Sequence, residues 1–584
     1  MLDTVIRGGR IVDGAGNRPF AGDIGIAAGK IVEIGKVSSP AREEIDADGA
    51  LVTPGFIDIH THYDGQFIWD SQIEPSFSHG VTTAVAGSCG VGFAPVRHEF
   101  RKELMNLMEG VEDIPGIVLD EGLDWNWDSF PDYLDRIARQ QYTIDVANFL
   151  PQAPLRVFVM GERALRHQSP TQADLEQMSR IVTEAMEAGA IGVSISRIHE
   201  HRSSTNDYVP GTFAEEDELT VLATAMGKTG KGVLQVAPLG AAGDFMGVRV
   251  TLEQRAAEHA RYERLAMASG RPVNYFVHEF PHDPGEWRKL LALTADAQAR
   301  GIPIFAQVSP RSTTLIMTLD GYHPFEARPS YKEVAHLPCA QRAAAMRDAG
   351  RRAAILREES VIAPSTDEFQ QRMRRMMELT LASYHAMRAP LDYEPDESTR
   401  FAEIAKTTNM GPDEVCYDYL TEGNGDNVAM SLGANYVGGN LDPVHEMLRD
   451  PNTLTGLGDG GAHLQVICDG SLPTFQLAFW AKDRKRGPKL PIELLVHKQT
   501  GKTAALLGLS DRGIIEPGRR ADINIIDLDR LACGYPHMQA DLPKGGKRIL
   551  QGSTGYVATL VNGATTRRND QPTGAMPGRL VRSH

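Results

Sequence analysis

The chain has 584 residues, of which 42% are hydrophobic and 23% charged, close to ordinary globular usage. Wholesale disorder, collagen-like repeats and coiled coils are therefore excluded. Its 60 basic and 76 acidic residues leave a formal net charge of −16 at pH 7. This acidic balance argues against a protein that binds nucleic acid or a membrane surface non-specifically, since both need an excess of Lys and Arg.

The cysteines and the N-terminal segment indicate the cellular compartment in which the protein resides. Five cysteines are scattered along the chain and odd in number, which favours reduced thiols over a disulfide framework. The opening segment, MLDTVIRGGRIVDG, lacks the basic head and apolar stretch of a secretory signal. No apolar run approaches the ~18–20 residues of a membrane span. We therefore expect a cytoplasmic protein.

Short strand patterns occur at both ends of the chain. Residues 1–53 alternate strand-forming residues with glycine-containing turns, and the same texture returns in GIIEPGRRADINIIDLD and TGYVATLVNG within residues 509–584. Termini of a domain often lie close together at its surface. We therefore predict one β-sandwich domain assembled from residues 1–53 and 509–584.

Residues 54–508 alternate apolar strand-like runs with helical patterns, which is typical of repeated βα units around a parallel sheet. The eight strand candidates are residues 55–60, 82–88, 145–150, 190–196, 232–237, 272–277, 302–308 and 454–459. They predict an α/β chain with a (β/α)8 barrel. The largest insertion, about 309–453, lies between strands seven and eight, where such a segment usually shapes or covers the active site.

The first chemical motif is His60-Thr61-His62, in GFIDIHTHYDG at the first barrel strand. Residues i and i+2 of a strand share a face, so the two imidazoles point into one space. They supply half of a metal site, since each neutral ring offers one nitrogen donor. The alternative is a pair of histidines held by backbone carbonyls, but the position at the first barrel strand favours metal ligands.

Two further residues follow strand candidates. Cys89, in GSCGVG, would be a strong zinc ligand as a thiolate, although a small buried cysteine is the commoner use of this residue. Asp459, in LGDGGAH, stands at the C-terminal end of strand eight, where a carboxylate can bind metal or take a proton. The alternative for Asp459 is an ordinary turn residue. His463 could support the same site or cap a helix.

Together these segments resemble the amidohydrolase superfamily, most closely its D-aminoacylase branch (N-acyl-D-amino-acid deacylases). The resemblance rests on VIRGGRIVDGAG, LVTPGFIDIHTHYDGQ, GVTTAVAGSCGVGFAP, EAGAIGVSIS, LGDGGAH and EPGRRADINIIDLD, and it spans nearly the whole chain. It implies a TIM-type barrel with a β-sandwich, bound zinc and hydrolysis of amide bonds by metal-activated water. It also implies that His60, His62 and Cys89 are zinc ligands, with Asp459 as general base and further ligand.

The chain departs from that branch at several positions. Strand five should carry a histidine, but residues 232–238 read GVLQVAP, and strand six offers only His278, one residue off register. Strand four lacks the lysine that many binuclear relatives carbamylate. His199 and His201 follow strand four, where a solvent-facing loop is the favoured interpretation. The four remaining donors suffice for one tetrahedral zinc, so we expect one Zn²⁺ per chain.

Arg311 directly follows strand seven, and its guanidinium could hold a substrate carboxylate through two hydrogen bonds. Pairing with acidic residues of the insertion is the alternative. The main hypothesis is a zinc-dependent hydrolase that deacylates an N-acyl (D-)amino acid or a related small amide, with Asp459 passing the proton to the leaving amine. Hydrolysis of a cyclic amide or another C–N bond is an alternative within the same chemistry.

A catalytically impaired barrel that only binds a ligand is the rival from another class, and the missing strand-five histidine motivates it. Among partners we expect a small-molecule amide, no nucleic acid and no membrane, while assembly into a homo-oligomer stays open. The sequence does not indicate the acyl group or the stereochemistry of the substrate.

Overall fold

The computed structural model describes residues 1–241, 243, 249–362 and 368–583. Within these ranges, parallel strands form at all eight predicted runs. They are β6 (Phe56–Asp58), β7 (Val81–Ala86), β8 (Asp145–Asn148) with its continuation β9 (Leu150–Pro151), β10 (Gly192–Ser196), β11 (Val233–Ala237), β12 (Val273–Phe276), β13 (Ile304–Val308) and β17 (Thr453–Thr455). Nearly every residue in them is buried, as expected for strands covered on both faces.

These strands pair with one another in chain order. β6, β7 and β8 form one parallel sheet, and β9, β10, β11, β12, β13 and β17 form a second. Phe149 alone separates β8 from β9, and a parallel bridge between Thr61 and Gly460 links the segments that follow β6 and β17. The pairing thus runs through all eight strands and returns to the first. Because parallel strands end at the same edge, the residues that follow them meet on one face.

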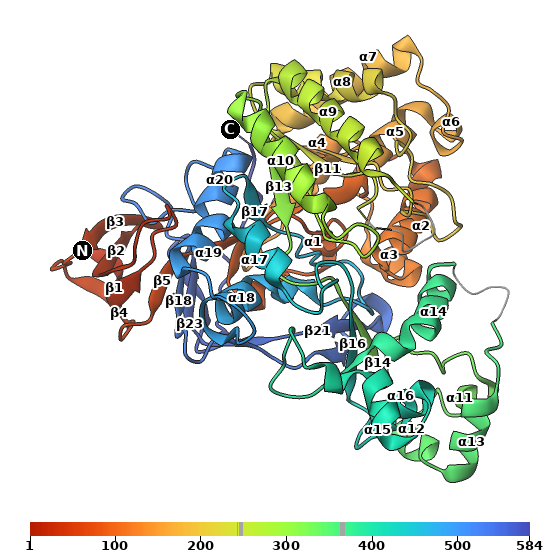
Figure 1. Cartoon of the computed structure of the whole chain (residues 1–584). Helices are drawn as coiled ribbons and strands as arrows, with labels where there is room; N and C mark the ends of the chain where they lie inside the picture. Colours follow the sequence, from red (N-terminus) through yellow and green to blue (C-terminus); the bar gives the residue numbers. More distant parts are fainter. Residues whose placement is uncertain (242, 244–248, 363–367, 584) are drawn as a thin grey trace.

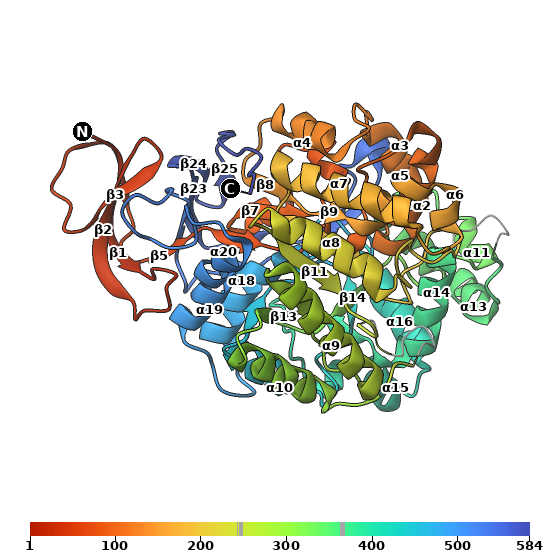
Figure 2. The same ribbon diagram turned by 90° about the horizontal axis from the view of Figure 1, so that it is seen from above.

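Helices cover the outside of the strands. α7 (Gln172–Ala188), α8 (Glu216–Lys228), α9 (Leu252–Ser269) and α10 (Glu286–Ala299) lie side by side in sequence order, as Figure 2 shows. α7 begins with a capping box between Thr171 and Asp174 and ends at Gly189, whose φ of 109° is readily adopted only by glycine. No helix among those described combines the length and the apolarity needed to cross a membrane.

Both ends of the chain build one sheet (Figure 1, red and dark blue). The N-terminal strands are β1 (Leu2–Ile11), β2 (Phe20–Ala27), β3 (Lys30–Gly35), β4 (Ala41–Asp46) and β5 (Leu51–Pro54). The C-terminal strands are β18 (Ile523–Ile526), β23 (Tyr556–Val561), β24 (Ala564–Arg568) and β25 (Gln571–Pro572). β5 pairs antiparallel with β18. The sheet divides at β1, which pairs first with β4 and then with β5.

The segment between β13 and β17 has a core of its own. β14 (Thr314–Thr318), β16 (Val428–Leu432) and β15 (His385–Met387) form a small antiparallel sheet. Around it lie α11 (Pro329–Lys332), α12 (Cys339–Met346), α13 (Ala349–Arg357), α14 (Glu368–Thr380), α15 (Phe401–Thr408) and α16 (Pro412–Thr421), at the lower right of Figure 1. Met317, Phe325, Met346 and Tyr417 are among its buried residues. α17 (Asp442–Arg449) then leads back to β17.

Candidate metal centre

Four predicted donors converge where β6, β7 and β17 end. His60 and His62 follow β6, Cys89 lies in the short 3-10 turn η2 (Ser88–Gly90) after β7, and Asp459 follows β17. Nε2 of His60 lies 3.2 Å from Sγ of Cys89 and 3.4 Å from Oδ1 of Asp459. Nε2 of His62 lies 3.7 Å from the same Asp459 oxygen. One donor atom each of His60, His62 and Cys89 fits within 4.8 Å of the others.

The backbone around two of these donors is strained. Cys89 has a φ of 56° and Asp459 a φ of 41°, in a region that non-glycine residues rarely occupy. Such residues cost on the order of 1–3 kcal/mol each and persist only where their surroundings hold them. Gly90 shows one such constraint, since a Cβ there would lie 2.8 Å from the backbone nitrogen of Ser196. The glycines beside Cys89 therefore let its turn approach β10 closely.

Carboxamide side chains of three of the parallel strands support this cluster. Gln307 of β13 donates from Nε2 to Oδ1 of Asn274, 3.0 Å away, so its Oε1 faces Nδ1 of His60 at 2.9 Å. His60 therefore donates from Nδ1 and turns the lone pair of Nε2 towards Cys89. The backbone N–H of Cys89 donates to Oε1 of Gln235 on β11 at 3.0 Å. Gln235, on the strand that lacks the expected histidine, thus holds the Cys89 turn in place.

Glu112 also reaches the cluster, and sequence reasoning missed it. It is the last residue of α2 (Arg101–Glu112), and its side chain is about 2% exposed. Its Oε1 lies 3.2 Å from Nδ1 of His62, and its Oε2 lies 3.7 Å from Nε2 of His463. Only tertiary packing brings the end of α2 to β6, and no local pattern around residue 112 signals it.

The protonation states follow from burial. Burial raises the pKa of the Cys89 thiol to about 12 and the pKa of the Glu112 carboxyl to about 7. It lowers the pKa of His60 to about 4. Burial also raises the pKa of Asp459. The adjacent rings of His62 and His60 outweigh this effect and hold the pKa of Asp459 well below its ordinary value. Burial lowers the pKa of His62, but the carboxylates of Glu112 and Asp459 outweigh it and hold that pKa well above its ordinary value. Asp459 is thus an ionised carboxylate beside a neutral thiol, the neutral ring of His60 and the protonated ring of His62.

The chemistry of these groups fits a zinc ion. Asp58, Glu112 and Asp459 are carboxylates enclosed around the histidines, and in the described part of the chain none of them has a recorded ion pair with Lys or Arg. Oδ2 of Asp58 has no hydrogen-bond partner there. A divalent cation would balance this negative charge and stabilise the thiolate of Cys89. Imidazole, thiolate and carboxylate are the donors that zinc takes in proteins.

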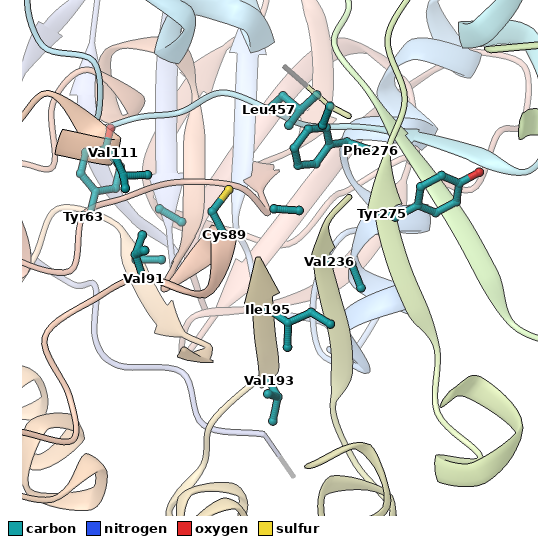
Figure 3. Close-up of a cluster of buried hydrophobic side chains, with 14 of the residues drawn as sticks. Tyr63, Cys89, Val91, Val111, Val193, Ile195, Val236, Tyr275, Phe276 and Leu457 are labelled. Atoms are coloured by element: carbon teal, nitrogen blue, oxygen red, sulfur yellow. The ribbon is translucent and has the colours of Figure 1, made fainter. Parts of the chain in front are cut away.

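A cavity of about 930 Å³ opens at the four donors. Leu315, Met373, Leu432 and Tyr436 of the insertion form part of its wall. Figure 3 shows the sulfur of Cys89 between Val111 on one side and Leu457 and Phe276 on the other, above Ile195 of β10 and Val236 of β11. The donors thus face a mainly apolar chamber, where electrostatic interactions are stronger than in water.

The cavity also receives two histidines whose place the sequence left open. His201 and His278 both line it, so the interpretation of His201 as part of a solvent-facing loop is wrong. Burial lowers the pKa of His201 to about 3 and that of His278 to about 4. His199 instead packs against Tyr208 and Phe213 and does not line the cavity. Both cavity histidines are neutral imidazoles in this state.

The model of the amidohydrolase family matches residues 43–567. The chain belongs to the amidohydrolase family. It falls in the D-aminoacylase-like branch, which confirms the resemblance seen in the sequence. It is 28% identical, over 603 aligned residues, to an uncharacterized protein of Mycobacterium tuberculosis, covering 97% of this chain and 92% of that one. It is 31% identical to the N-acyl-D-glutamate deacylase of Alcaligenes xylosoxydans xylosoxydans, over 54% of this chain and 59% of that enzyme.

Solved structures show the same fold. A D-aminoacylase crystal structure superposes with a TM-score of 0.64 at 22% identity, over 100% of both chains. The zinc and phosphonate complex of the N-acyl-D-glutamate deacylase from Bordetella bronchiseptica superposes with a TM-score of 0.63 at 21% identity, over 100% of this chain and 99% of that one. Family membership and the deacylase relatives together support hydrolysis of C–N bonds by this amidohydrolase.

Arg311 lies elsewhere than expected in this amidohydrolase. Its side chain is fully buried, and Nη2 donates to Oδ1 of Asp469 at 2.7 Å and to the carbonyl of Cys468 at 3.1 Å. Its guanidinium carbon lies 4.2 Å from the ring centre of Tyr393. Arg311 does not line the cavity, whereas its partner Asp469 does. A guanidinium enclosed in this way supports the cavity wall and does not reach a substrate carboxylate.

Proposed function

We propose that this amidohydrolase removes the acyl group from an N-acyl (D-)amino acid or a related small amide, using one bound zinc ion. The observation that carries the proposal is the convergence of His60, His62, Cys89 and Asp459 at a mainly apolar cavity of about 930 Å³. The deacylases among its relatives support the substrate class. The five free thiols support a reducing compartment such as the cytoplasm.

The proposal extends to the architecture. Residues 54–508 would form the metal-dependent (β/α)8 barrel, with an insertion at about 309–453 that closes over the cavity. The strand pairing that returns from β17 to the segment after β6 supports it. Residues 1–53 and 509–584 would form the β-sandwich domain, supported by the pairing of β5 with β18.

Each residue of the centre has a distinct task. His60, His62 and Cys89 would hold the zinc ion, with Asp459 close enough to share it. When bound, zinc polarises a carbonyl group and lowers the pKa of water at the site towards neutrality. The carboxylate of Asp459 takes the proton of the attacking water and delivers it to the nitrogen of the leaving amine. Asp459 is ionised, so its carboxylate has a free lone pair for that proton.

The apolar wall has a task of its own. Val111, Phe276 and Leu457 line the cavity together with Cys89, and residues of the insertion form another part of its wall. Exclusion of bulk water from this space strengthens the attraction between the developing negative charge of the transition state and the groups that face it. The insertion would thus set both the shape of the acyl pocket and its dryness.

A substrate panel tests the proposal. Zinc-loaded protein is incubated with N-acetyl-D-amino acids, their L-enantiomers and cyclic amides such as hydantoins, and the release of free amine or ring-opened acid is measured. We expect amine release from the D-series. Ring opening alone would favour the cyclic-amide alternative, and zinc binding with no turnover on any substrate would favour a barrel that only binds its ligand.

A further inference from the structure

We propose that Glu112 is a positioning residue, which orients His62 for the metal and makes its imidazole a stronger donor. The inference rests on the proposed zinc centre, because it assigns a role to a residue that contacts a proposed ligand. Glu112 approaches the ring of His62 from behind, at Nδ1, with 3.2 Å between the two atoms. The opposite nitrogen, Nε2, faces Asp459.

The ion pair with Glu112, which lacks good hydrogen-bond geometry, determines which ring nitrogen of His62 carries a proton. A carboxylate only accepts hydrogen bonds, so the ring nitrogen that faces it must carry the proton. When metal is bound, His62 would then present the lone pair of Nε2 to the space shared with Asp459 and Cys89. A carboxylate behind an imidazole also raises the basicity of the ring, and such partners typically contribute 10–100-fold to metal affinity.

The carboxylate is held firmly in its place. The backbone carbonyl of Glu112 accepts a hydrogen bond from the N–H of His463 in the loop after β17. At the next residue, Asp113, Oδ1 accepts from the hydroxyl of Tyr322 at 3.1 Å, and Oδ2 accepts from the N–H of Gln465 at 3.2 Å. Gly110, two residues before Glu112, packs closely on another segment: a Cβ there would lie 2.1 Å from the carbonyl carbon of Ser203.

These contacts make the end of α2 a junction. It joins the loop after β10, the loop after β17 that carries Asp459, and the insertion, which holds Tyr322. Because three separate segments hold the backbone at Glu112, its side chain has little freedom to move. The distance from Glu112 to His62 is therefore set by the fold. This is the condition under which a supporting residue can hold a ligand in its productive geometry.

His60 provides an internal comparison. Its Nδ1 also meets a supporting oxygen, Oε1 of Gln307 at 2.9 Å, but that support is a neutral carboxamide. Both supports fix the tautomer of their histidine, whereas only Glu112 adds a negative charge. Loss of the charge at position 112 should therefore weaken metal binding while the neutral analogue still occupies the space. The two histidines would be unequal donors, with His62 the stronger.

Burial of Glu112 away from any recorded Lys or Arg partner in the described residues agrees with this role. Its recorded ion pairs in the described residues are with His62 and His463 only, and its Oε1 makes no hydrogen bond of good geometry. A carboxylate enclosed in this way is costly for a folded chain unless a cation lies nearby. A zinc ion on the far side of His62 would be that cation.

The test measures metal affinity and needs no substrate. Zn²⁺ affinity is determined by competition with a chromogenic chelator, and the absorption spectrum of the Co²⁺-substituted protein reports the ligand geometry. Glu112→Gln keeps the shape and removes the charge, and we expect roughly 10–100-fold weaker Zn²⁺ binding. Glu109→Gln is the matched control on the same helix: it also removes one negative charge, its carboxamide oxygen can still accept from the N–H of Gly116, and Glu109 does not line the cavity. Its affinity should equal that of the wild type.

Each outcome decides the matter. Unchanged Zn²⁺ affinity in a folded Glu112→Gln variant would overturn the inference, as would equal losses in Glu112→Gln and Glu109→Gln. If Glu112→Gln does not fold, Zn²⁺ affinity is measured in Glu112→Asp. The shorter Asp side chain retains the charge but places it farther from His62. Wild-type affinity in Glu112→Asp would then overturn the inference. A wild-type protein that binds neither metal would contradict the proposed centre itself, together with the role of Glu112.

Discussion

The sulfur of Cys89 lies 3.2 Å from Nε2 of His60, although 29 residues separate the two in the chain. The contact arises because β6 and β7 are parallel neighbours and both residues follow the same edge of the sheet. In this state a thiol with a pKa of about 12 faces an imidazole with a pKa of about 4, so neither group carries a charge. A bound cation would remove the thiol proton and make the sulfur a ligand.

Replacement of Cys89 by alanine should therefore remove the metal. We expect the zinc content to fall from about one ion per chain towards none, with loss of hydrolysis, because the strongest anionic donor is gone. Elemental analysis of the purified variant measures this directly. Cys339→Ala, at a half-buried thiol of α12, is the matched control and should keep its zinc. Full zinc content in Cys89→Ala would contradict the assignment of Cys89.

Asp459→Asn should leave the fold intact and stop the reaction. An amide cannot accept the proton of the attacking water, and loss of a general base typically reduces turnover about 10²–10⁴-fold. Steady-state kinetics on the best substrate of the panel gives kcat and KM, and thermal melting gives the stability. We expect the loss in kcat. Asp217→Asn, at an exposed position of α8, is the control. Undiminished kcat in Asp459→Asn would exclude the carboxylate as the base.

The strands and the residues that follow them could be predicted from the sequence because both depend on patterns within short segments. Period-two side-chain alternation identifies His60 and His62 as a pair on one face, and parallel strands bring Cys89 and Asp459 to the same edge. The strand positions agree with the structure within a few residues, most closely where the apolar run is bounded by glycine or proline. Strand register and strand order thus account for the donor set.

The misplaced and missed residues depend on information of another kind. The position of Arg311 after β13 places it at the edge of the sheet where the strands end, but does not say which way its side chain points. The side chain turns towards Asp469, which the folded loop after β17 brings close. Glu112 reaches His62 because the end of α2 lies against the segment that follows β6. His201 enters the cavity for a similar reason. Contacts between distant segments leave no periodic signal that sequence reasoning can use.

Arg311→Met should destabilise the protein without affecting substrate recognition. Removal of one member of a buried ion pair leaves the charge of Asp469 uncompensated and typically costs about 3–5 kcal/mol. We expect a lower midpoint of urea unfolding, with KM of the remaining folded enzyme unchanged. Arg288→Met is the control, because Arg288 pairs with Glu446 at the surface and such pairs contribute roughly 0–1 kcal/mol. A large rise in KM at full stability would restore Arg311 as a substrate ligand.

His79 should make the stability of the fold depend on pH. It is fully buried at the end of η1 (Ser76–His79), with Nδ1 2.8 Å from Oγ1 of Thr474 and Nε2 2.6 Å from the carbonyl of Gln551. Burial lowers its pKa to about 3, against about 6.5 in an unfolded chain. Between these two values the unfolded chain binds a proton that the folded chain does not.

The free energy of unfolding should therefore fall as the pH decreases below about 6.5, by up to ~1.4 kcal/mol per pH unit from this residue. Urea unfolding curves at a series of pH values from 7.5 to about 4 measure the slope. His79→Gln removes the titrating group, so the dependence on pH should be shallower than in the wild type, while the lost packing lowers stability at every pH. An equally steep slope in His79→Gln would mean that other buried groups, and not His79, take up the proton on unfolding.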